Sequence, residues 1–573
     1  MGNCQDMNKK RYFSEFDYDE ESGVFKFPES FNHSYSDGMD VEKNMLEILK
    51  RSKDNSIFSE ELRNEIKDWV TEYHFSSDRH NLLRNFDFEN KSILELGSGC
   101  GALTRYLGEK AKDVVGVEGS FLRAKCTSQR CRDLDNVKVY SSNFVQLIPE
   151  NKFDYVTLIG VLEYSSRFIK SKTPFADCIK IAKSFLKKDG KLIIAIENRL
   201  GLKYFSGLSE DHTSKPYFGL YDLYKEDTGK TFGKYELMNL LNSCGLHFNE
   251  FLYPFPDYKI PTLILTEQSL SENINLSDIL FRIIPRDYSN QSNNNFYDNL
   301  VWESIEKNKL IDQFSNSFLV ISSKEKIVTD NNLVYHYTTN RRNKYNVSTT
   351  FKKLSNEIVV SKDYILKDIS NSYNDVISHK IESNKYIYGT LLESRIEKAI
   401  VANRMEDLIE YLNIWLKFLF KNAIKVRNDD IFKSEIKNDF FDCIPRNIIL
   451  NEGKLSCIDK EWSIDSKMSL YFLILRYFLF WDYKRINYIN NMFSNNKSYL
   501  MNIFRKLNIQ IVNSEFSRFE KFINDIHFEI LGDKYQFELD KRILRKKKYF
   551  VIKKIIKKIL TLIQKKIHKL VGE

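Results

Sequence analysis

A chain of 573 residues exceeds what one hydrophobic core usually organises, so its length predicts two or more domains. Hydrophobic residues make up 42% of it, and its net charge is +9. Positions 541–573 hold thirteen Lys and Arg against one Glu, a net charge of +12, which leaves −3 for the rest. Basicity confined to the tail excludes a broadly basic nucleic-acid-binding body, and a nucleic-acid partner is not expected.

The eight cysteines are scattered, with no C-x-x-C pair and no His spacing typical of zinc. We therefore expect reduced cytosolic thiols, most of them in the core. The polar, acidic N-terminus does not resemble a secretory signal, and Asp6 does not suit a myristoylation motif. No apolar run reaches the length of a membrane span.

Residues 1–60 show no firm period and are assigned as an N-terminal extension, followed by a predicted helix over 61–69. A strand-forming run over 93–96 then leads into three alternate glycines, Gly97, Gly99 and Gly101. A turn of this kind needs glycine because the backbone adopts unusual dihedrals and a ligand must approach without a Cβ in the way. A helix-compatible segment follows at once, so its free N–H groups would face the ligand.

The next apolar run ends in Glu118, whose carboxylate suits the two hydroxyls of an adenosine ribose. Gly97, Gly99 and Ala102 also satisfy the nicotinamide fingerprint G-x-G-x-x-G/A, which is weak by itself. Glu95 favours a different cofactor, because it lies two residues before the first glycine, where it can reach the cationic amino group of S-adenosylmethionine. The additional glycine, Gly101, points the same way.

Asn143 follows a short strand over 137–140 and can contact the edge of an adenine, and a fourth strand begins at 153. Together these residues resemble class I S-adenosylmethionine-dependent methyltransferases over about 69–324. The resemblance implies an α/β fold, with a Rossmann-like sheet covered by helices on both faces, over 61–328. Such enzymes often close the cofactor site with an element before the first strand, which makes Tyr73 and Arg79 candidate cofactor contacts. Alternatively, they are ordinary helix and loop residues.

A helix over 174–186 and a fifth strand over 191–196 continue the alternation, which predicts ligand binding at the carboxyl ends of the strands. The acceptor substrate is expected there, with Asn198, Asp211 and His212 as candidate catalytic residues. His212 could act as a general base, since imidazole titrates near neutral pH; a structural hydrogen bond is the alternative. An insertion over about 266–312 is a further place for substrate specificity.

The spacing of Asp442, Asn447 and Asp459 is that of the kinase catalytic hairpin. This part, over 329–535, resembles aminoglycoside and choline phosphotransferase-like kinases. The resemblance implies ATP and Mg²⁺, with Asp442 taking the proton of the acceptor hydroxyl and Asn447 and Asp459 holding the metal. Lys362 would pair the phosphates, and Glu382, on a following helix, would be its ion-pair partner.

The kinase resemblance has departures. Phe440 and Phe441 replace the dipeptide that contains His, Lys460 and Glu461 stand where a protein kinase has Phe-Gly, and no Gly-rich loop is recognisable. A kinase-like lobe without activity, which binds the acceptor instead, is therefore the alternative.

The tail, 536–573, has aliphatic residues at three- and four-residue intervals with lysines on the other face. This pattern fits a helix on an anionic membrane surface. A helix packed on the kinase-like lobe and a nucleic-acid contact are the alternatives.

The order of these modules is similar to that of the bifunctional kinase-methyltransferases that terminate bacterial O-antigen polysaccharides. The resemblance implies a glycan or sugar-phosphate acceptor, glycosyltransferase partners, and a cytoplasmic, peripheral location on the inner membrane. This chain lacks the sustained heptad repeats that such proteins can carry after the kinase. An RNA methyltransferase with a basic anchoring tail is the alternative from another class.

Overall fold

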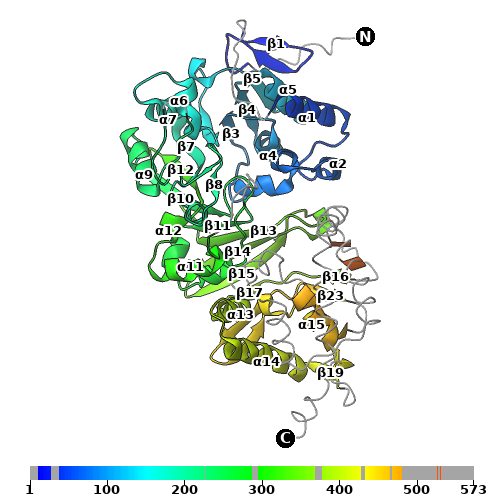
Figure 1. Cartoon of the computed structure of the whole chain (residues 1–573). Helices are drawn as coiled ribbons and strands as arrows, with labels where there is room; N and C mark the ends of the chain where they lie inside the picture. The colour runs from blue at the N-terminus through cyan, green and yellow to red at the C-terminus, as the bar shows by residue number, and fades with distance from the viewer. Residues whose placement is uncertain are drawn as a thin grey trace. The chain divides into compact units, whose positions relative to one another are not determined.

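The computed structural model describes residues 11–27, 38–225, 228–286, 295–367, 377–426, 433–464, 468–479, 525–526 and 529–530 (Figure 1). The chain divides into two compact units. The first comprises Met1–Glu272, Ile283–Asp298 and Ser304–Tyr337, and the second Asn273–Arg282, Asn299–Glu303 and Thr338–Glu573. The predicted insertion is therefore divided between the units, and the main division falls between Tyr337 and Thr338.

A parallel sheet forms the centre of the first unit, with strand order β5-β4-β3-β6-β7. β12 pairs antiparallel with β7, and β10 pairs antiparallel with β12. This mostly parallel α/β sheet confirms the predicted fold class for the first unit. The strands are β3 (Ser92–Leu96), β4 (Asp113–Glu118), β5 (Val137–Ser141), β6 (Phe153–Ile159), β7 (Leu186–Glu197), β10 (Phe248–Phe255) and β12 (Ser317–Ser323).

Helices connect successive parallel strands, as a crossover connection requires. α4 (Ala102–Lys110) joins β3 to β4, α5 (Phe121–Arg130) joins β4 to β5, and α7 (Pro174–Ser184) joins β6 to β7. α9 (Lys234–Ser243) precedes β10. The strands are buried on both faces, since Ile93, Leu94, Val114 and Val115 are all fully buried. Near-continuous apolar strands are typical of parallel sheets.

The N-terminal segment, for which the sequence predicts little, belongs to the first unit. β1 (Asp17–Asp19) and β2 (Val24–Lys26) form a hairpin, and β2 pairs parallel with β5, which extends the sheet. Tyr140 of β5 stacks on Phe25, with ring centroids 4.6 Å apart. α1 (Met39–Arg51) buries Met45 and Leu49 together with Cys126 of α5. The hairpin and α1 therefore contribute to the same fold as the glycine turn.

β11 (Leu263–Thr266) pairs with β10 and with β13 (Asn332–Thr338). Helices lie between β11 and β12 in the chain, as expected for a partly helical insertion. They are α10 (Leu276–Leu280), α11 (Asp298–Lys307) and α12 (Ile311–Phe314).

The second unit combines small antiparallel sheets with helices. β14 (Val347–Leu354), β15 (Glu357–Tyr364) and β17 (Asn384–Lys385) pair in that order. β16 (Ile377–His379) pairs with β23 (Trp462–Ile464). A three-stranded sheet has the order β18 (Thr390–Leu391), β21 (Ile448–Asn451), β22 (Lys454–Cys457), and another has the order β19 (Ala423–Lys425), β20 (Glu435–Ile436), β24 (Met468–Ser469).

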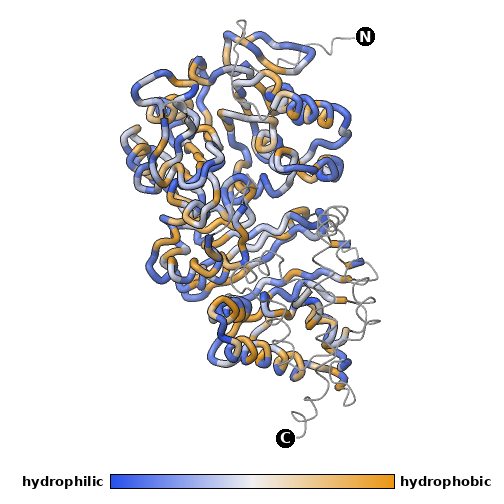
Figure 2. The backbone as a smooth tube through the Cα atoms, viewed as in Figure 1, coloured by the Kyte–Doolittle hydropathy of each residue, from blue (hydrophilic) through white to orange (hydrophobic). Residues whose placement is uncertain are grey.

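The helices of the second unit are α13 (Leu392–Val401), α14 (Met405–Lys421) and α15 (Leu470–Leu479). Hydrophobic and hydrophilic residues alternate along α14 (Figure 2), as expected for a helix with one buried face. Its inner face buries Leu408, Leu412 and Trp415, and the Trp415 ring N–H donates to the carbonyl of Cys443 at 3.0 Å. α14 is thereby fixed to the loop that carries Asp442.

One sequence-based expectation about cysteine is wrong in part. Cys443 and Cys457 form a disulfide, which joins the Asp442 loop to β22. The other described cysteines lie outside disulfides and are buried, as expected for core thiols: Cys100, Cys126, Cys131, Cys178 and Cys244. Sequence spacing did not predict the pair because its members are fourteen positions apart, with the first strand and the turn of a hairpin between them.

Among the residues that the structure describes, no helix is long and apolar enough to cross a bilayer. The basic tail over 536–573 lies outside the described residues, so its predicted amphipathic helix stays a prediction.

Candidate active site

The glycine turn after β3 adopts the conformation that only glycine adopts readily. Gly97, Gly99 and Gly101 have φ angles of 87°, 58° and 82°. A Cβ on Gly97 would lie 2.4 Å from the side chain of Val161, and one on Gly101 would lie 2.8 Å from the Thr127 backbone. Both close approaches exclude any larger residue. Backbone geometry and packing therefore both require glycine in this turn, and we call Gly97, Gly99 and Gly101 the glycine cradle.

Glu118, at the carboxyl end of β4, closes the other side of this cradle. Its carboxylate accepts hydrogen bonds from the N–H of Gly99 at 2.8 Å and of Ser120 at 3.0 Å. Each carboxylate oxygen keeps acceptor capacity beyond these single bonds. The group is thus held at the tip of the second strand, where the two hydroxyls of a ribose would meet it.

Glu95 lies just before the turn and is buried, with 3% of its surface exposed. Thr104 donates to its carboxylate at 2.5 Å. Burial raises the pKa of Glu95 to about 8, although the Thr104 hydrogen bond and nearby Arg79 lower it. A buried carboxyl of this kind suits a cationic amino group, because the positive charge would offset the cost of ionising the buried carboxyl.

The remaining predicted cofactor contacts differ in role. Asn143 follows β5 and is nine-tenths buried; its side-chain oxygen accepts from the N–H of Val145 at 3.1 Å. Arg79 donates to the carbonyls of Tyr258 at 2.8 Å and Lys259 at 2.9 Å, and to the hydroxyl of Tyr73 at 3.1 Å. Arg79 therefore fixes the loop over 258–259, and Tyr73 is its neighbour, which favours the structural alternative for both.

Comparison with known proteins agrees with this geometry. Residues 69–223 match the protein-family model described as a methyltransferase domain. The first unit contains a methyltransferase domain. This confirms the enzyme class and the S-adenosylmethionine cofactor expected from the glycine turn.

Curated relatives match over part of their length. Ribosomal RNA small subunit methyltransferase A of Mesomycoplasma hyopneumoniae (strain 232) is 32% identical over 119 residues, which cover 21% of this chain and 42% of that protein. Ribosomal protein L11 methyltransferase of Prochlorococcus marinus (strain MIT 9515) is 32% identical over 107 residues, covering 17% of this chain and 35% of that protein. The chain thus spans less than half the length of these relatives.

Similar solved structures include the DhpI complex with S-adenosylhomocysteine, at 18% identity and a TM-score of 0.22, covering 30% of this chain and 74% of that one. Another is the N-methyltransferase NodS of Bradyrhizobium japonicum WM9 with S-adenosylhomocysteine, at 17% identity and a TM-score of 0.21, covering 28% and 74%.

Next to the glycine cradle of the methyltransferase domain lies a buried polar group, at the carboxyl ends of β6 and β7. It contains Glu163 in the short helix η3 (Leu162–Tyr164), Glu197 at the last position of β7, and His212 in the loop after β8 (Ser209–Glu210). Ligand atoms of these three side chains lie within 4.8 Å of one another. Val161, which contacts Gly97 of the cradle, is two residues from Glu163.

His212 is held on both sides. Its Nε2 lies 3.1 Å from Glu197 and its Nδ1 lies 2.7 Å from the hydroxyl of Tyr164, and only 2% of its side chain is exposed. Burial by itself lowers the pKa of His212, but the Glu197 carboxylate raises it above its usual value. Both ring nitrogens of His212 therefore have partners. This differs from the prediction that His212 faces the acceptor directly and acts as a base.

The positive charges of two lysines offset the negative charges of the carboxylates in this group. Lys259 contacts both Glu197 and Asp211, and Lys203 lies 3.6 Å from Asp211 and 3.7 Å from Asp257. Although burial by itself raises the pKa of Glu197, Lys259 and His212 hold it well below its usual range. Burial raises the pKa of Glu163 to about 7. Asp211 therefore belongs to the group as an ion-pair partner of two lysines.

Asn198 has a different role from the one predicted. It is fully buried, and its amide donates to the carbonyls of Gln313 and Ser315, each at 2.7 Å. Its oxygen accepts from the N–H of Leu200 at 3.0 Å. These backbone contacts occupy the side chain, so Asn198 ties the loop after β7 to the segment before β12 and does not face an acceptor.

In the second unit, the predicted kinase-like residues converge only in part. Lys362 of β15 contacts Asp459 and lies 3.2 Å from Glu461. Burial by itself lowers the pKa of Lys362, but these two carboxylates raise it above its usual value. Asn447 lies beside Asp459 at the base of the β21-β22 hairpin, since its carbonyl accepts from the N–H of Ile458 at 2.8 Å.

Glu382 is not the partner of Lys362. It lies in an irregular segment instead of a helix, and it is an exposed residue that pairs with Lys380 at 2.8 Å. Glu461 occupies the partner role, and it also accepts from Arg341 at 2.6 Å. The helix expected after β15 is not among the described residues of this region, where 377–391 holds three short strands joined by irregular segments.

Asp442, the predicted base, forms an ion pair with Arg476 of α15. Its own carbonyl accepts from the Asn447 side chain at 3.0 Å. The side chain is about nine-tenths buried, so a substrate hydroxyl would have to compete with Arg476 for it.

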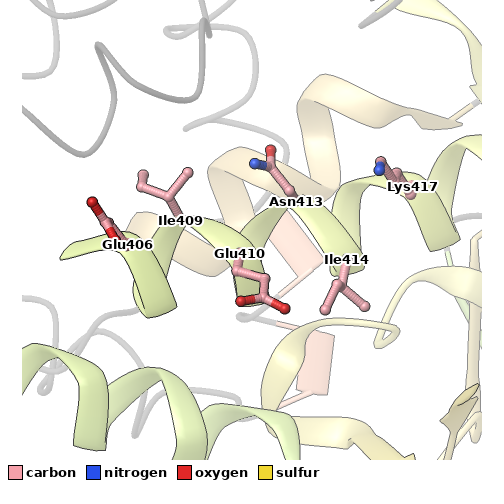
Figure 3. Close-up of a pocket in the computed structure, with 6 residues that line it drawn as sticks. All are labelled: Glu406, Ile409, Glu410, Asn413, Ile414 and Lys417. Carbon is pink, nitrogen blue, oxygen red and sulfur yellow. The ribbon is translucent and has the colours of Figure 1, made fainter. Parts of the chain in front are cut away.

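A separate pocket runs along α14, lined by Glu406, Ile409, Glu410, Asn413, Ile414 and Lys417 (Figure 3). All of these residues come from one helix, and none of them belongs to the predicted kinase-like site. The pocket therefore does not mark that site.

Sequence reasoning missed Glu163, Glu197, Lys259, Arg341 and Glu461. Glu163 and Glu197 stand at the ends of predicted strands, and strand-end position was the signal that could have found them. Lys259 and Arg341 lie in loops, and the glutamates that they contact, Glu197 and Glu461, are 62 and 120 residues away in the chain.

Proposed function

We propose that this chain is an S-adenosylmethionine-dependent methyltransferase that methylates a surface polysaccharide or a sugar intermediate. The observation that carries the proposal is the cradle of three left-handed glycines closed by the Glu118 carboxylate. The methyltransferase family match over 69–223 supports the reaction class. The acceptor class rests on the resemblance of the module order to O-antigen-terminating enzymes.

The residues of the cradle fit the parts of this cofactor, which supplies a methyl group on a positively charged sulfonium. Glu95 would hold its amino group, Glu118 its ribose hydroxyls, and Asn143 the edge of its adenine. Methyl transfer is an in-line displacement, so the chain mainly has to hold the acceptor close and aligned.

The acceptor is assigned to the polar group at the ends of β6 and β7. Glu163, Glu197 and Asp211 offer acceptors for sugar hydroxyls, while Lys203 and Lys259 offer positive charge to a phosphate. A sugar hydroxyl or a sugar phosphate would each find complementary side chains there. A phosphate acceptor needs no base, because it is already anionic.

We propose further that the second unit binds Mg-ATP through Lys362, Asn447 and Asp459 and phosphorylates the glycan. The convergence of Lys362 with Asp459 supports nucleotide binding. The Asp442–Arg476 ion pair favours the alternative, a non-catalytic acceptor-binding module. The tail would hold the enzyme on the anionic, cytoplasmic face of the inner membrane, beside its glycosyltransferase partners.

RNA methylation is the second candidate, because one curated relative is named as a ribosomal RNA methyltransferase. The net charge of −3 outside the tail counts against it. Salt-sensitive RNA binding that survives neutralisation of the tail lysines would favour RNA over a glycan.

Calorimetric titration of S-adenosylmethionine and of Mg-ATP into the full chain tests both sites. Gly99→Asp is expected to abolish only the first binding, and Asp459→Ala only the second. Binding of S-adenosylmethionine alone would reduce the second unit to a docking module. Failure of S-adenosylmethionine to bind a folded chain would refute the methyltransferase proposal.

A further inference from the structure

The buried polar group beside the cofactor cradle has the composition of a metal site. Glu163, Glu197 and His212 come from three different segments, the residues after β6, the end of β7 and the loop after β8. Their ligand atoms lie within 4.8 Å of one another. Two carboxylates and one imidazole that converge from separate segments are the donors that first-row divalent ions accept.

The separation of two of these donors fits neighbouring positions around one ion. Glu197 Oε2 lies 3.1 Å from His212 Nε2. Ligands at adjacent octahedral positions, with metal–ligand bonds of about 2.1 Å, lie roughly 3 Å apart. Lys259 contacts the other oxygen of Glu197, Oε1, and so leaves Oε2 on the His212 side.

A second, independent observation concerns Glu163. Its side chain is fully buried, and its Oε2 has no hydrogen-bond partner among the residues that the structure describes. The other oxygen, Oε1, accepts from Tyr258 at 3.3 Å. Burying a carboxylate oxygen without a partner is costly, and such groups usually indicate a missing water or ion. Glu163 Oε2 therefore indicates a ligand at the place where His212 and Glu197 converge.

We propose that the first unit binds one divalent transition-metal ion of the Mn²⁺ class through Glu163, Glu197 and His212. The imidazole disfavours Mg²⁺ and Ca²⁺, which select all-oxygen sites. The absence of a thiolate among the three donors disfavours ions that prefer sulfur. Lys259 and Asp211 would act as outer partners that orient Glu197.

The role of this ion rests on the proposed function. Three protein ligands leave positions open for an acceptor oxygen, at the strand ends where the acceptor is assigned. Two neighbouring sugar hydroxyls, or a phosphate, would fill these positions. A hydroxyl bound to the ion would release its proton to solvent more readily, because the cation stabilises the alkoxide. His212 would then be a metal ligand, which accounts for its burial better than the role of a free base does.

The test is titration of metal-stripped, tag-free full chain with Mn²⁺ by electron paramagnetic resonance. The Asp459→Asn background removes the carboxylate from the two metal ligands proposed for the second unit, Asn447 and Asp459. We expect one bound ion, and loss of at least about tenfold in affinity in Glu163→Gln and in His212→Asn. Glu210→Gln is the matched control, since Glu210, the last residue of β8, is a buried carboxyl two positions before His212 whose Oε1 accepts from Tyr224 and Thr231. It should keep the ion.

Spin-echo modulation of the wild-type chain with Mn²⁺ adds a measurement that needs no variant, because a coordinated imidazole nitrogen gives a characteristic signal. Absence of that signal, or equal Mn²⁺ affinity in wild type and Glu163→Gln, would overturn the proposal. S-adenosylmethionine is titrated in parallel. Cofactor binding without Mn²⁺ binding would overturn only the metal site, whereas Mn²⁺ binding without cofactor binding would overturn only the methyltransferase function.

Discussion

Replacing Gly97 with alanine should destabilise the first unit in two separable ways. A residue with a Cβ pays about 1–2 kcal/mol for a left-handed backbone, and Gly97 has a φ of 87°. The added Cβ would also lie 2.4 Å from Val161 Cγ2, so a packed side chain must move, at about 1–3 kcal/mol. The free energy of unfolding is therefore expected to fall by about 2–5 kcal/mol.

Gly245→Ala separates these contributions. Gly245 has a similar φ of 74° in the same unit, but its added Cβ would meet only the end of the flexible Lys183 side chain. Urea unfolding of the full chain, following the transition that S-adenosylmethionine shifts, measures both variants. We expect Gly97→Ala to lose about 1–3 kcal/mol more than Gly245→Ala. Equal losses would refute the argument that Val161 closes the cradle.

Three further predictions concern named side chains. Burial raises the pKa of Glu95 to about 8 from 4.5, so below pH 8 the free protein keeps a proton that an ion pair with the cofactor would expel. Calorimetric affinity for S-adenosylmethionine should therefore rise with pH by up to about tenfold per unit between about pH 6 and 7.5, and this slope should vanish in Glu95→Gln. Asn198→Ala removes three hydrogen bonds to backbone groups and should lower the free energy of unfolding, measured by thermal unfolding, by about 2–4 kcal/mol. The affinity for the cofactor should not change. Unchanged stability together with lost turnover would restore the predicted role of Asn198 in acceptor binding. Lys362→Met should weaken Mg-ATP binding about tenfold or more. Glu382→Gln should change this affinity by no more than about twofold, because Glu382 is exposed. A larger loss of affinity in Glu382→Gln than in Lys362→Met would return Glu382 to the role first predicted.

The sequence by itself determined the features that depend on local backbone geometry and on strand order. Three alternate glycines between an apolar run and a helix specify a turn, because no other residue adopts these dihedrals readily. Glu118 ends one parallel strand and Asn143 follows the next, and the carboxyl ends of these strands meet at one edge of the sheet. The glycine turn and its place after β3 could therefore be predicted from the sequence.

Only the tertiary structure decided which polar side chains face one another. Asn198 and Glu197 are neighbours in the chain, yet Asn198 is occupied by backbone carbonyls while Glu197 meets His212 and Lys259. Glu382 and Glu461 were equally available to Lys362, and the fold placed Glu461 there. Partners of this kind are separated by up to 120 residues, and no local propensity encodes them. Their choice depends on the burial and hydrogen-bonding needs of the whole unit, which the sequence satisfies only once it is folded.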